Sequence, residues 1–293
     1  MSNSVKLKAY AKINLSLDIT GILENGYHSL ESVFQSISLC DIITVSLNNT
    51  GNITIESDNS EIPSGKGNIA YKAAAAFFEY IKCTESGADI KISKNIPSKA
   101  GMGGGSADAA AVLTALDYLC KSGISEKELC SIGEKIGADV PFCIKGGTVF
   151  AEGTGNILHT LPCADNGYFL CVAKGSDGIS TVEAYHKFDE MQKTIVHPDT
   201  ALILEKIKNN DLKSAFEYFG NVFEQTTNLD DVDFIKKTML ENNAETALMT
   251  GSGSAVFGIF ENIGNAEKCM RILQKNNMFA DVCGFMDKGC EFI

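Results

Sequence analysis

The chain has 293 residues, of which 44% are hydrophobic and 21% are charged. These values are typical of a globular protein, and the length is enough for one large domain or two ordinary ones. The net charge of −12 argues against broad binding to nucleic acids or anionic membranes, because both require clustered positive charge. We therefore expect no nucleic-acid partner and no membrane partner.

The ten cysteines are scattered along the chain and include no Cys-x-x-Cys pair. This usage favours reduced, mostly buried thiols over disulfides, and hence a reducing compartment. The first residues lack the apolar run of a signal peptide, and no window approaches the ~20 apolar residues of a membrane span. The sequence predicts a cytoplasmic protein.

The first half of the chain is predicted to be rich in strands, because apolar residues alternate with other residues from Val5 onward. The strands predicted in this half span residues 5–20, 30–39, 42–48, 52–57, 88–93 and 146–151, with a hairpin turn at 48–51. The predicted helices span 68–82, 106–120 and the segment from Ser125 to Gly137, in which Ser125 and Glu128 match a capping box.

From about Thr181 the pattern becomes mainly helical. In the second half, helices are predicted over 181–190, 198–208, 211–219, 230–241 and 264–276, and strands over 167–173, 254–260 and 279–286. The predicted class is α+β in two lobes, with mixed or antiparallel sheets. The lobes are expected to span residues 1–160 and 161–293. The turn Asp165-Asn-Gly167 is the most plausible place for the chain to pass from one lobe to the other.

A glycine-rich run, Pro97 to Ala111, stands between a predicted strand and an Ala-rich helix. Glycine permits positive φ and close approach of a ligand, and a helix that starts after such a loop presents free N–H groups and a positive dipole end. Together these features predict an anion site, most often for phosphate. The plainer alternative is a flexible turn capped by Ser106.

Two familiar nucleotide motifs do not fit this run. It is not a P-loop because no Gly-Lys-Ser/Thr follows, and Ser64-Gly-Lys-Gly67 lacks the hydroxyl residue that would hold magnesium. A dinucleotide fingerprint would place Asp108 where a small residue is needed. The chain has one arginine, Arg271, so phosphate must be bound by backbone N–H groups, lysines, hydroxyls and metal.

Four segments besides the glycine-rich run are candidates for chemistry. Lys12 and Asn14 alternate with apolar residues and therefore leave one face of a strand, which is either a solvated face or a working one. Asp139 lies in Gly137-Ala-Asp-Val-Pro141, predicted to be a short turn in which Pro141 stops the chain from re-entering a helix; the carboxylate either caps the turn locally or does chemistry.

The last two signals are weaker. Thr250-Gly-Ser-Gly253 is a hydroxyl-rich glycine turn before a strand, which either approaches a phosphate or the first loop, or forms an ordinary hairpin turn. Tyr27 and His28 leave a turn beside the Lys12 strand; a lone histidine is usually structural, but such a pair can stack on a base and hydrogen-bond to it.

In order and spacing these segments resemble those of the GHMP kinases, a family that includes galactokinase, homoserine kinase and mevalonate kinase. The resemblance spans residues 11–253. The Gly-Gly-Gly-Ser form of the loop and the Gly-Tyr-His segment are similar to the branch that acts on 4-diphosphocytidyl-2-C-methyl-D-erythritol. Met102 stands where the family usually has Leu.

The resemblance implies a two-lobed GHMP kinase fold with the active site in the cleft between an N-terminal ATP-binding domain and a C-terminal domain that contributes to the substrate site. It implies transfer of phosphate from ATP to the 2-hydroxyl of the CDP-linked methylerythritol, in the non-mevalonate isoprenoid pathway. Magnesium is expected with the nucleotide, held largely by phosphates and water, with Ser106 as a candidate protein ligand, and no acidic metal cage is visible.

The resemblance also implies roles for individual residues. The catalytic pair would be Asp139, which accepts or orients the hydroxyl proton, and Lys12. The implied ATP-binding residues are Asn68, Lys94, Pro97, Ser98, Lys99, Ala100, Gly101, Met102, Gly103, Gly104, Gly105, Ser106 and Ala107. The implied substrate-binding residues are Asn14, Tyr27, His28, Phe34, Tyr185, Thr250, Gly251, Ser252 and Gly253, with the aromatic ones on the cytidine side.

Three alternatives stay open at this point. One is a GHMP kinase for another small alcohol such as homoserine, and a second is a non-catalytic nucleotide-binding regulator; the presence of Lys12 and Asp139 argues against the second. A dinucleotide-dependent oxidoreductase is disfavoured by the imperfect fingerprint and by the lack of an early βαβ unit. The expected oligomeric state is a monomer or a homodimer.

Overall fold

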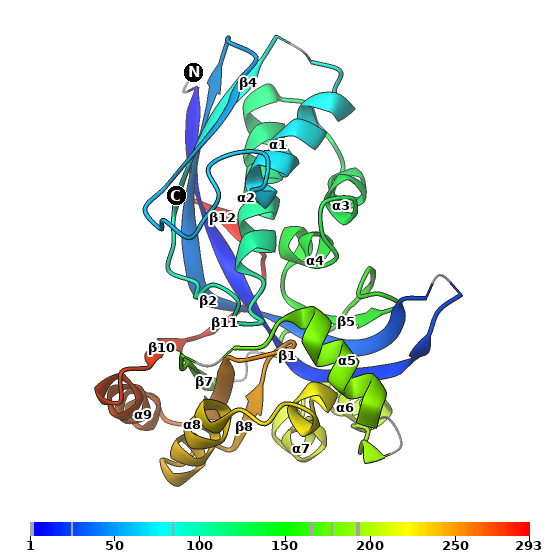
Figure 1. The fold of residues 1–293 in the computed structure, drawn as a ribbon, viewed down its shortest axis with the longest axis vertical. Helices are drawn as coiled ribbons and strands as arrows, with labels where there is room; N and C mark the ends of the chain where they lie inside the picture. The colour runs from blue at the N-terminus through cyan, green and yellow to red at the C-terminus, as the bar shows by residue number, and fades with distance from the viewer. Residues whose placement is uncertain (1–2, 25, 84, 165–166, 177, 192–193) are drawn as a thin grey trace.

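Two β-sheets organise the fold, one in each lobe of the molecule (Figure 1). The computed structural model describes residues 3–24, 26–83, 85–164, 167–176, 178–191 and 194–293. The predicted lobe boundary at Asp165 and Asn166 lies outside the described residues. The predicted α+β class with mixed and antiparallel sheets is confirmed.

The larger sheet is built around two long antiparallel strands. Its central order is β12-β1-β2-β4-β3, while β5 and β11 pair with the remaining length of β2, and β6 pairs with β5. Its strands are β1 (Ser4–Ile22), β2 (His28–Asn48), β3 (Ile53–Ser57), β4 (Gly87–Ser93), β5 (Thr148–Glu152), β6 (Ile157–Thr160), β11 (Phe285–Met286) and β12 (Cys290–Phe292).

Two details of this sheet differ from the sequence-based expectation. The strands predicted at 30–39 and 42–48 are one strand, β2, whose pairing with β1 shifts register between Tyr10 and Ala11. The hairpin predicted at 48–51 is wrong, because β2 pairs with β4 and β3 pairs in parallel with β4. Such a crossover depends on long-range pairing, which a local turn signal does not report.

Helices cover one face of the larger sheet (Figure 1). They are α1 (Ile69–Tyr80), α2 (Gly104–Cys120), α3 (Glu126–Glu134) and α4 (Val140–Lys145). The alanines of α2 are fully buried, and their small side chains let the helix pack closely against β1, α1 and α4. The predicted capping box of Ser125 and Glu128 is present at the start of α3.

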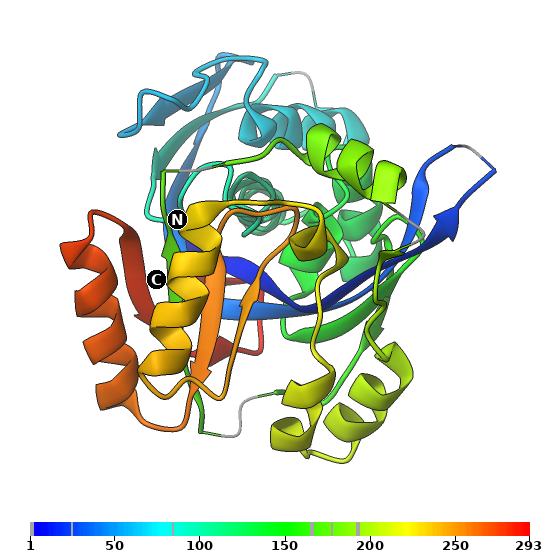
Figure 2. The ribbon, with the colours of Figure 1, turned by 60° about the horizontal axis from the view of Figure 1, so that its bottom comes forward.

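The smaller sheet has the order β10-β7-β9-β8 and is antiparallel throughout. Its strands are β7 (Phe169–Lys174), β8 (Thr246–Met249), β9 (Val256–Phe260) and β10 (Phe279–Cys283). Figure 2 shows α8 (Asp230–Glu241) and α9 (Ile263–Lys275) side by side against this sheet. The remaining helices of this lobe are α5 (Thr181–Met191), α6 (Thr200–Lys208), α7 (Leu212–Ala215) and the 3₁₀ turns η2 (Phe216–Tyr218) and η3 (Val222–Gln225).

The chain returns to the larger sheet near its end. The strand predicted at 279–286 is in fact two strands, because β10 belongs to the smaller sheet and β11 to the larger one, with Gly284 between them. The last strands therefore tie the two lobes together. The division of the chain at residue 160 stays a prediction.

None of the described helices has both the length and the apolar character needed to cross a membrane. All ten cysteines carry free thiols, but only Cys143, Cys171, Cys269 and Cys283 are buried, so the expectation of mostly buried thiols is wrong.

Replacing Phe77 with Ala should destabilise the larger lobe strongly. Phe77 is fully buried in α1, which packs on α2, so its loss removes apolar contacts and leaves a cavity. We expect the free energy of unfolding to fall by about 3–5 kcal/mol. Denaturant titration should show this loss, whereas Glu79→Ala on the exposed face of α1 should change the midpoint little; equal effects would contradict the packing described here.

Candidate active site

The glycine-rich run forms one wall of a cleft of about 670 Å³ beside the start of α2. The helix starts at Gly104, two residues before the predicted start, and its N-cap is Gly103 with φ 69° and without a side-chain cap. The first N–H groups of α2 therefore have no partner within the helix and are available to an anion. All residues from 97 to 106 line this cleft, whereas Ala107 is buried behind it.

Hydrogen bonds hold this loop to both lobes. The backbone N–H of Lys12 in β1 donates to the Met102 carbonyl over 3.0 Å, and that of Ala255 donates to the Ala100 carbonyl over 3.2 Å. Gly101 has φ +76°, and a Cβ there would lie 2.2 Å from the Thr250 carbonyl oxygen. Glycine is required at this position because a second turn, 250–253, packs directly on its backbone.

A second pocket, of about 310 Å³, adjoins the start of α2. It shares the walls Gly101, Gly103 and Ser106 with the larger cleft. Of its described lining residues, Lys12 alone is basic and Asp139 alone is acidic. The Lys12 ammonium lies 3.8 Å from Asp139 Oδ2, so the pocket holds one ion pair beside the anion-binding loop.

Asp139 is positioned by a helix that the sequence did not predict. Pro141 does not keep the chain out of a helix; it stands in the first turn of α4, and Asp139 is the N-cap. Proline is tolerated there because the N–H it lacks has no helical partner anyway. The Asp139 side chain makes no capping hydrogen bond, so the local-cap alternative is excluded and the carboxylate faces the pocket.

Lys12 and Asn14 are not on a solvated face. Their residues are 5% and 0% exposed, and Lys12 Nζ donates to Asn14 Oδ1 over 2.7 Å. The Lys12 ammonium also lies 5.1 Å from the centre of the Phe34 ring, within the range of a cation–π contact. A buried ammonium with these partners is held in one place inside the pocket.

Asn68 lines the larger cleft, but both polar atoms of its side chain are already hydrogen-bonded within the protein. Its Oδ1 accepts from the Ala70 N–H to cap α1, and its Nδ2 donates to the Pro63 carbonyl. Asn68 therefore shapes this wall of the cleft.

The Lys94 side chain is also engaged by neighbouring residues. Its ammonium is buried between the carboxylates of Asp41 and Asp108. Burial alone would lower the pKa of Lys94, but these carboxylates outweigh it and raise the pKa. Burial raises the pKa of Asp108 well above its ordinary value despite the nearby ammonium. This cluster of Lys94, Asp41 and Asp108 stabilises the wall of the larger cleft below the glycine-rich loop.

The aromatic candidates are divided between the pocket and its rim. Phe34 and Tyr185 line the pocket, while Tyr27 and His28 do not. The His28 ring packs on Tyr185 with 4.6 Å between centroids, and His28 Nε2 lies 2.7 Å from Asp189 Oδ1. Burial raises the pKa of Tyr185, with Asp139 adding to the rise.

The 250–253 turn reaches the same pocket through Gly251 and Ser252. Sequence reasoning missed six further lining residues, Leu17, Leu30, Ala138, Thr154, Thr181 and Phe223. Of these, Thr181 could have been found because it starts a predicted helix, and its Oγ1 lies 3.1 Å from Ser252 Oγ. Most of the others come from strands and turns without a local signal.

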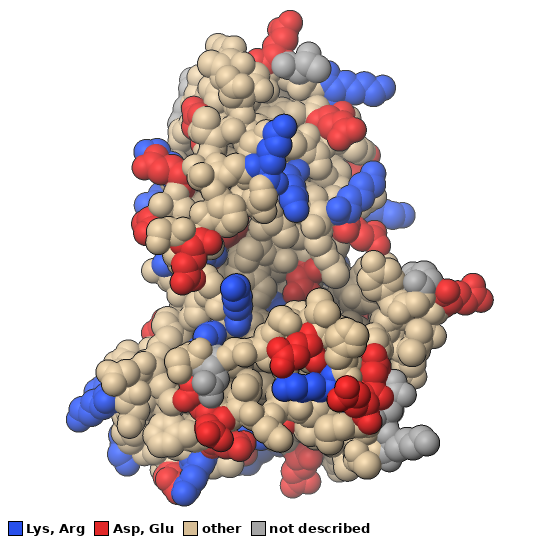
Figure 3. All heavy atoms as spheres, viewed as in Figure 1, with Lys and Arg blue, Asp and Glu red and all other residues tan. Residues whose placement is uncertain are grey.

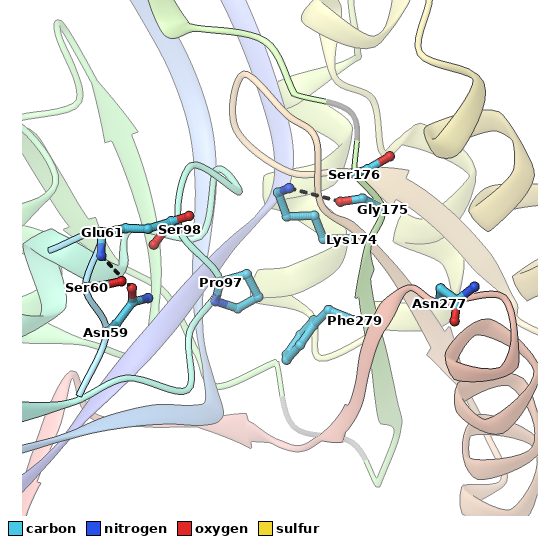
Figure 4. A pocket seen from close by; sticks show the side chains of 10 residues that line it. All are labelled: Asn59, Ser60, Glu61, Pro97, Ser98, Lys174, Gly175, Ser176, Asn277 and Phe279. Carbon is cyan, nitrogen blue, oxygen red and sulfur yellow. Dashed lines mark hydrogen bonds between the residues drawn. The ribbon is translucent and has the colours of Figure 1, made fainter.

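Both sites lie along the boundary between the lobes. Figure 3 shows this boundary as a hollow across the middle of one face, with basic and acidic side chains inside it. A further cleft of about 470 Å³ adjoins the nucleotide side and shares Glu61, Pro97 and Ser98 with it. In Figure 4, Pro97 and Ser98 lie on one side of this cleft, and Lys174, Phe279 and Asn277 on the other.

Known proteins are similar to this sequence over nearly its whole length. The 4-diphosphocytidyl-2-C-methyl-D-erythritol kinase of Clostridium tetani (strain Massachusetts / E88) is 45% identical over 273 residues, which are 91% of this chain and 95% of the relative. The protein of the same name from Desulfitobacterium hafniense (strain Y51) is 42% identical and covers 98% of both chains. This chain belongs to the GHMP kinase family.

Family patterns and solved structures agree with this assignment. The GHMP kinases N terminal domain matches residues 68–147, and the GHMP kinases C terminal domain matches residues 203–278. A crystal structure of 4-(cytidine 5'-diphospho)-2C-methyl-D-erythritol kinase aligns with a TM-score of 0.78 at 28% identity, over 95% of this chain and 99% of that one. A homoserine kinase from Cytophaga hutchinsonii, 18% identical, shares the fold with a TM-score of 0.79, over 100% of this chain and 98% of that one.

Replacing Gly101 with Ala should damage the site more than the fold elsewhere. The new Cβ would collide with the Thr250 carbonyl, and the positive φ is strained for alanine, so the loop and the 250–253 turn must separate. We expect a loss of ATP affinity and turnover, measured by nucleotide titration and steady-state kinetics. Gly21→Ala is the matched control, because a Cβ there meets nothing within 4 Å; unchanged kinetics in Gly101→Ala would contradict the close contact.

Proposed function

We propose that this protein transfers the γ-phosphoryl group of ATP to the 2-hydroxyl of 4-diphosphocytidyl-2-C-methyl-D-erythritol, giving the 2-phosphate and ADP. The names of its relatives support this substrate. The observation that carries the proposal is the Lys12–Asp139 pair, which lies where the pocket and the anion-binding loop share their walls. A phosphate on the start of α2 would lie next to an acceptor in the pocket.

The residues present suit phosphoryl transfer, which depends on positioning and charge neutralisation more than on covalent help. Backbone N–H groups at Gly104–Ser106 would bind the phosphates, which removes the need for arginine. Asp139 would orient the acceptor hydroxyl and take up or share its proton. Lys12 would stabilise the negative charge that develops on the oxygen and keep Asp139 ionised.

Magnesium would be bound through the phosphates of the nucleotide. Within the described parts of the chain, no group of three or more His, Cys, Asp or Glu side chains could hold a metal by itself. Ser106 and Asp139 nevertheless place oxygen donors beside the start of α2, and magnesium commonly keeps its waters and binds one or two protein oxygens together with phosphate. When bound, the ion neutralises phosphate charge.

The aromatic side of the pocket supports a cytidine-bearing acceptor. Tyr185 offers a ring within the pocket, and His28 packs behind it with its own partner Asp189. Stacking on a ring face and hydrogen bonding to the base edge are what a pyrimidine requires. Tyr27, which is 68% exposed and does not line the pocket, is proposed to contact the base from the solvent side.

We also propose a cytoplasmic location, which the ten free thiols support. The oligomeric state, monomer or homodimer, stays a prediction.

Measuring ADP release with ATP and magnesium tests the substrate directly. We expect release with 4-diphosphocytidyl-2-C-methyl-D-erythritol and none above background with homoserine or mevalonate, because neither fills an aromatic base site. Release with homoserine alone would assign the chain to another acceptor. ATP binding without release for any of the three would contradict the catalytic assignment.

Replacing Asp139 with Asn should lower kcat by about 100-fold or more while the protein stays folded, because the amide cannot take up the hydroxyl proton or balance the Lys12 charge. Steady-state kinetics and circular dichroism check the two halves of this prediction. Asp233→Asn on the exposed face of α8 serves as the control. Wild-type turnover in Asp139→Asn would remove the role assigned to this residue.

A further inference from the structure

The amide oxygen of Asn14 already accepts as many hydrogen bonds as it can, so it has no capacity left for a substrate. Oδ1 accepts from Lys12 Nζ over 2.7 Å, from the Gly251 N–H over 3.0 Å and from Thr250 Oγ1 over 3.1 Å. A carbonyl oxygen has two lone pairs, so three donors leave no capacity for a further one. The residue is 0% exposed.

The orientation of this amide is fixed by its surroundings. Asn14 Nδ2 donates to Ser32 Oγ over 2.8 Å, and Ser32 Oγ in turn donates its proton to the Ser16 carbonyl over 2.6 Å. Because the Ser32 proton is used, Ser32 can only accept from Asn14, and the opposite flip would also turn NH₂ toward the Lys12 ammonium and the Gly251 N–H. The oxygen of Asn14 must therefore face Lys12.

The contacts of Asn14 cross the boundary between the lobes. Lys12 and Asn14 belong to β1 of the larger sheet, whereas Thr250 and Gly251 belong to the turn after β8 of the smaller sheet. Thr250 Oγ1 also accepts from the Asn14 backbone N–H over 2.9 Å. The location of the Lys12 ammonium thus depends on where the other lobe places this turn.

A second buried amide holds the turn from the far side. Asn221 Nδ2 donates to the carbonyls of Met249 and Gly251, each over 2.8 Å, and its Oδ1 accepts from the Phe223 N–H over 3.0 Å. Asn221 is 3% exposed and is absent from the walls of both the nucleotide cleft and the acceptor pocket. Asn221 therefore acts on the reaction through the groups that it holds, which are the 250–253 turn and Phe223, a lining residue of the acceptor pocket.

We propose that Asn14 and Asn221 are positioning residues that couple the docking of the 250–253 turn to the placement of the Lys12 ammonium beside Asp139. This inference rests on the proposed kinase function and changes one expectation from the sequence, since Asn14 was expected to bind substrate. The geometry gives it the role of holding Lys12, so that the ion pair is assembled only when the two lobes are docked.

A double-mutant experiment separates positioning from substrate binding. Lys12→Ala, Asn14→Leu and the double variant are compared by steady-state kinetics with wild-type enzyme. Leu is close in shape to Asn but offers no acceptor. We expect Asn14→Leu to lower kcat by about 10- to 100-fold and to change the KM for either substrate less than about 3-fold. In the Lys12→Ala background the same change should cost less than about 3-fold.

Two further variants sharpen the result. Asn14→Asp keeps an acceptor for Lys12 and should recover most of the kcat that Asn14→Leu loses. Asn221→Asp keeps the bond to the Phe223 N–H but removes both donations to the turn, so it should lower kcat and leave KM nearly unchanged, although it lines neither pocket. Circular dichroism shows whether Asn14→Leu folds. If it does not, the loss of kcat caused by Asn221→Asp is compared between the enzyme with Lys12 and the Lys12→Ala variant, and this comparison tests the coupling.

The contradicting outcomes are distinct. A rise in the KM for the acceptor with unchanged kcat in Asn14→Leu would return this residue to substrate binding. Equal losses with and without Lys12, or an Asn221→Asp enzyme with wild-type kcat, would overturn the coupling. A wild-type enzyme that fails to phosphorylate the CDP-linked alcohol contradicts the proposed function instead; the crystal structure of Asn14→Leu then tests the positioning, which predicts a displaced Lys12 ammonium.

Discussion

The close packing of two glycine turns, one around Gly101 and the other around Gly251, is the constraint on which the rest of the site depends. A side chain on either glycine would collide with the backbone of the other turn, so the phosphate loop and the C-terminal lobe meet without any intervening group. This contact brings the start of α2, the Lys12 ammonium and the wall of the acceptor pocket together. The two pockets consequently share their walls instead of lying apart.

The charges available at the site bear on how phosphate is proposed to bind. The chain has a net charge of −12 and a single arginine, and of the two lysines that line the larger cleft, Lys94 is buried between two carboxylates. Backbone N–H groups at a helix start cost no additional charge and are already oriented, so they suit this protein well. In the proposed mechanism Lys12 serves the reacting oxygen, and its contacts with Asn14 and Asp139 hold it there.

Much of this arrangement could be predicted from the sequence because it is encoded locally. The glycine run between a strand and an Ala-rich helix predicts the anion loop, and the alternation around Lys12 and Asn14 predicts that both side chains share a face. Local signals did not report helix α4, whose N-cap is Asp139, the split of β10 and β11 between two sheets, or the partners of Lys94. These features depend on packing between segments far apart in the chain.

A crystal structure with a non-hydrolysable ATP analogue, magnesium and 4-diphosphocytidyl-2-C-methyl-D-erythritol tests the central claim most directly. The account predicts the phosphates on the N–H groups of Gly104–Ser106 and the 2-hydroxyl between Asp139 and Lys12, in line with the γ-phosphorus. A nucleotide bound in the adjoining cleft between Ser98 and Lys174, or an acceptor hydroxyl remote from Asp139, would contradict it.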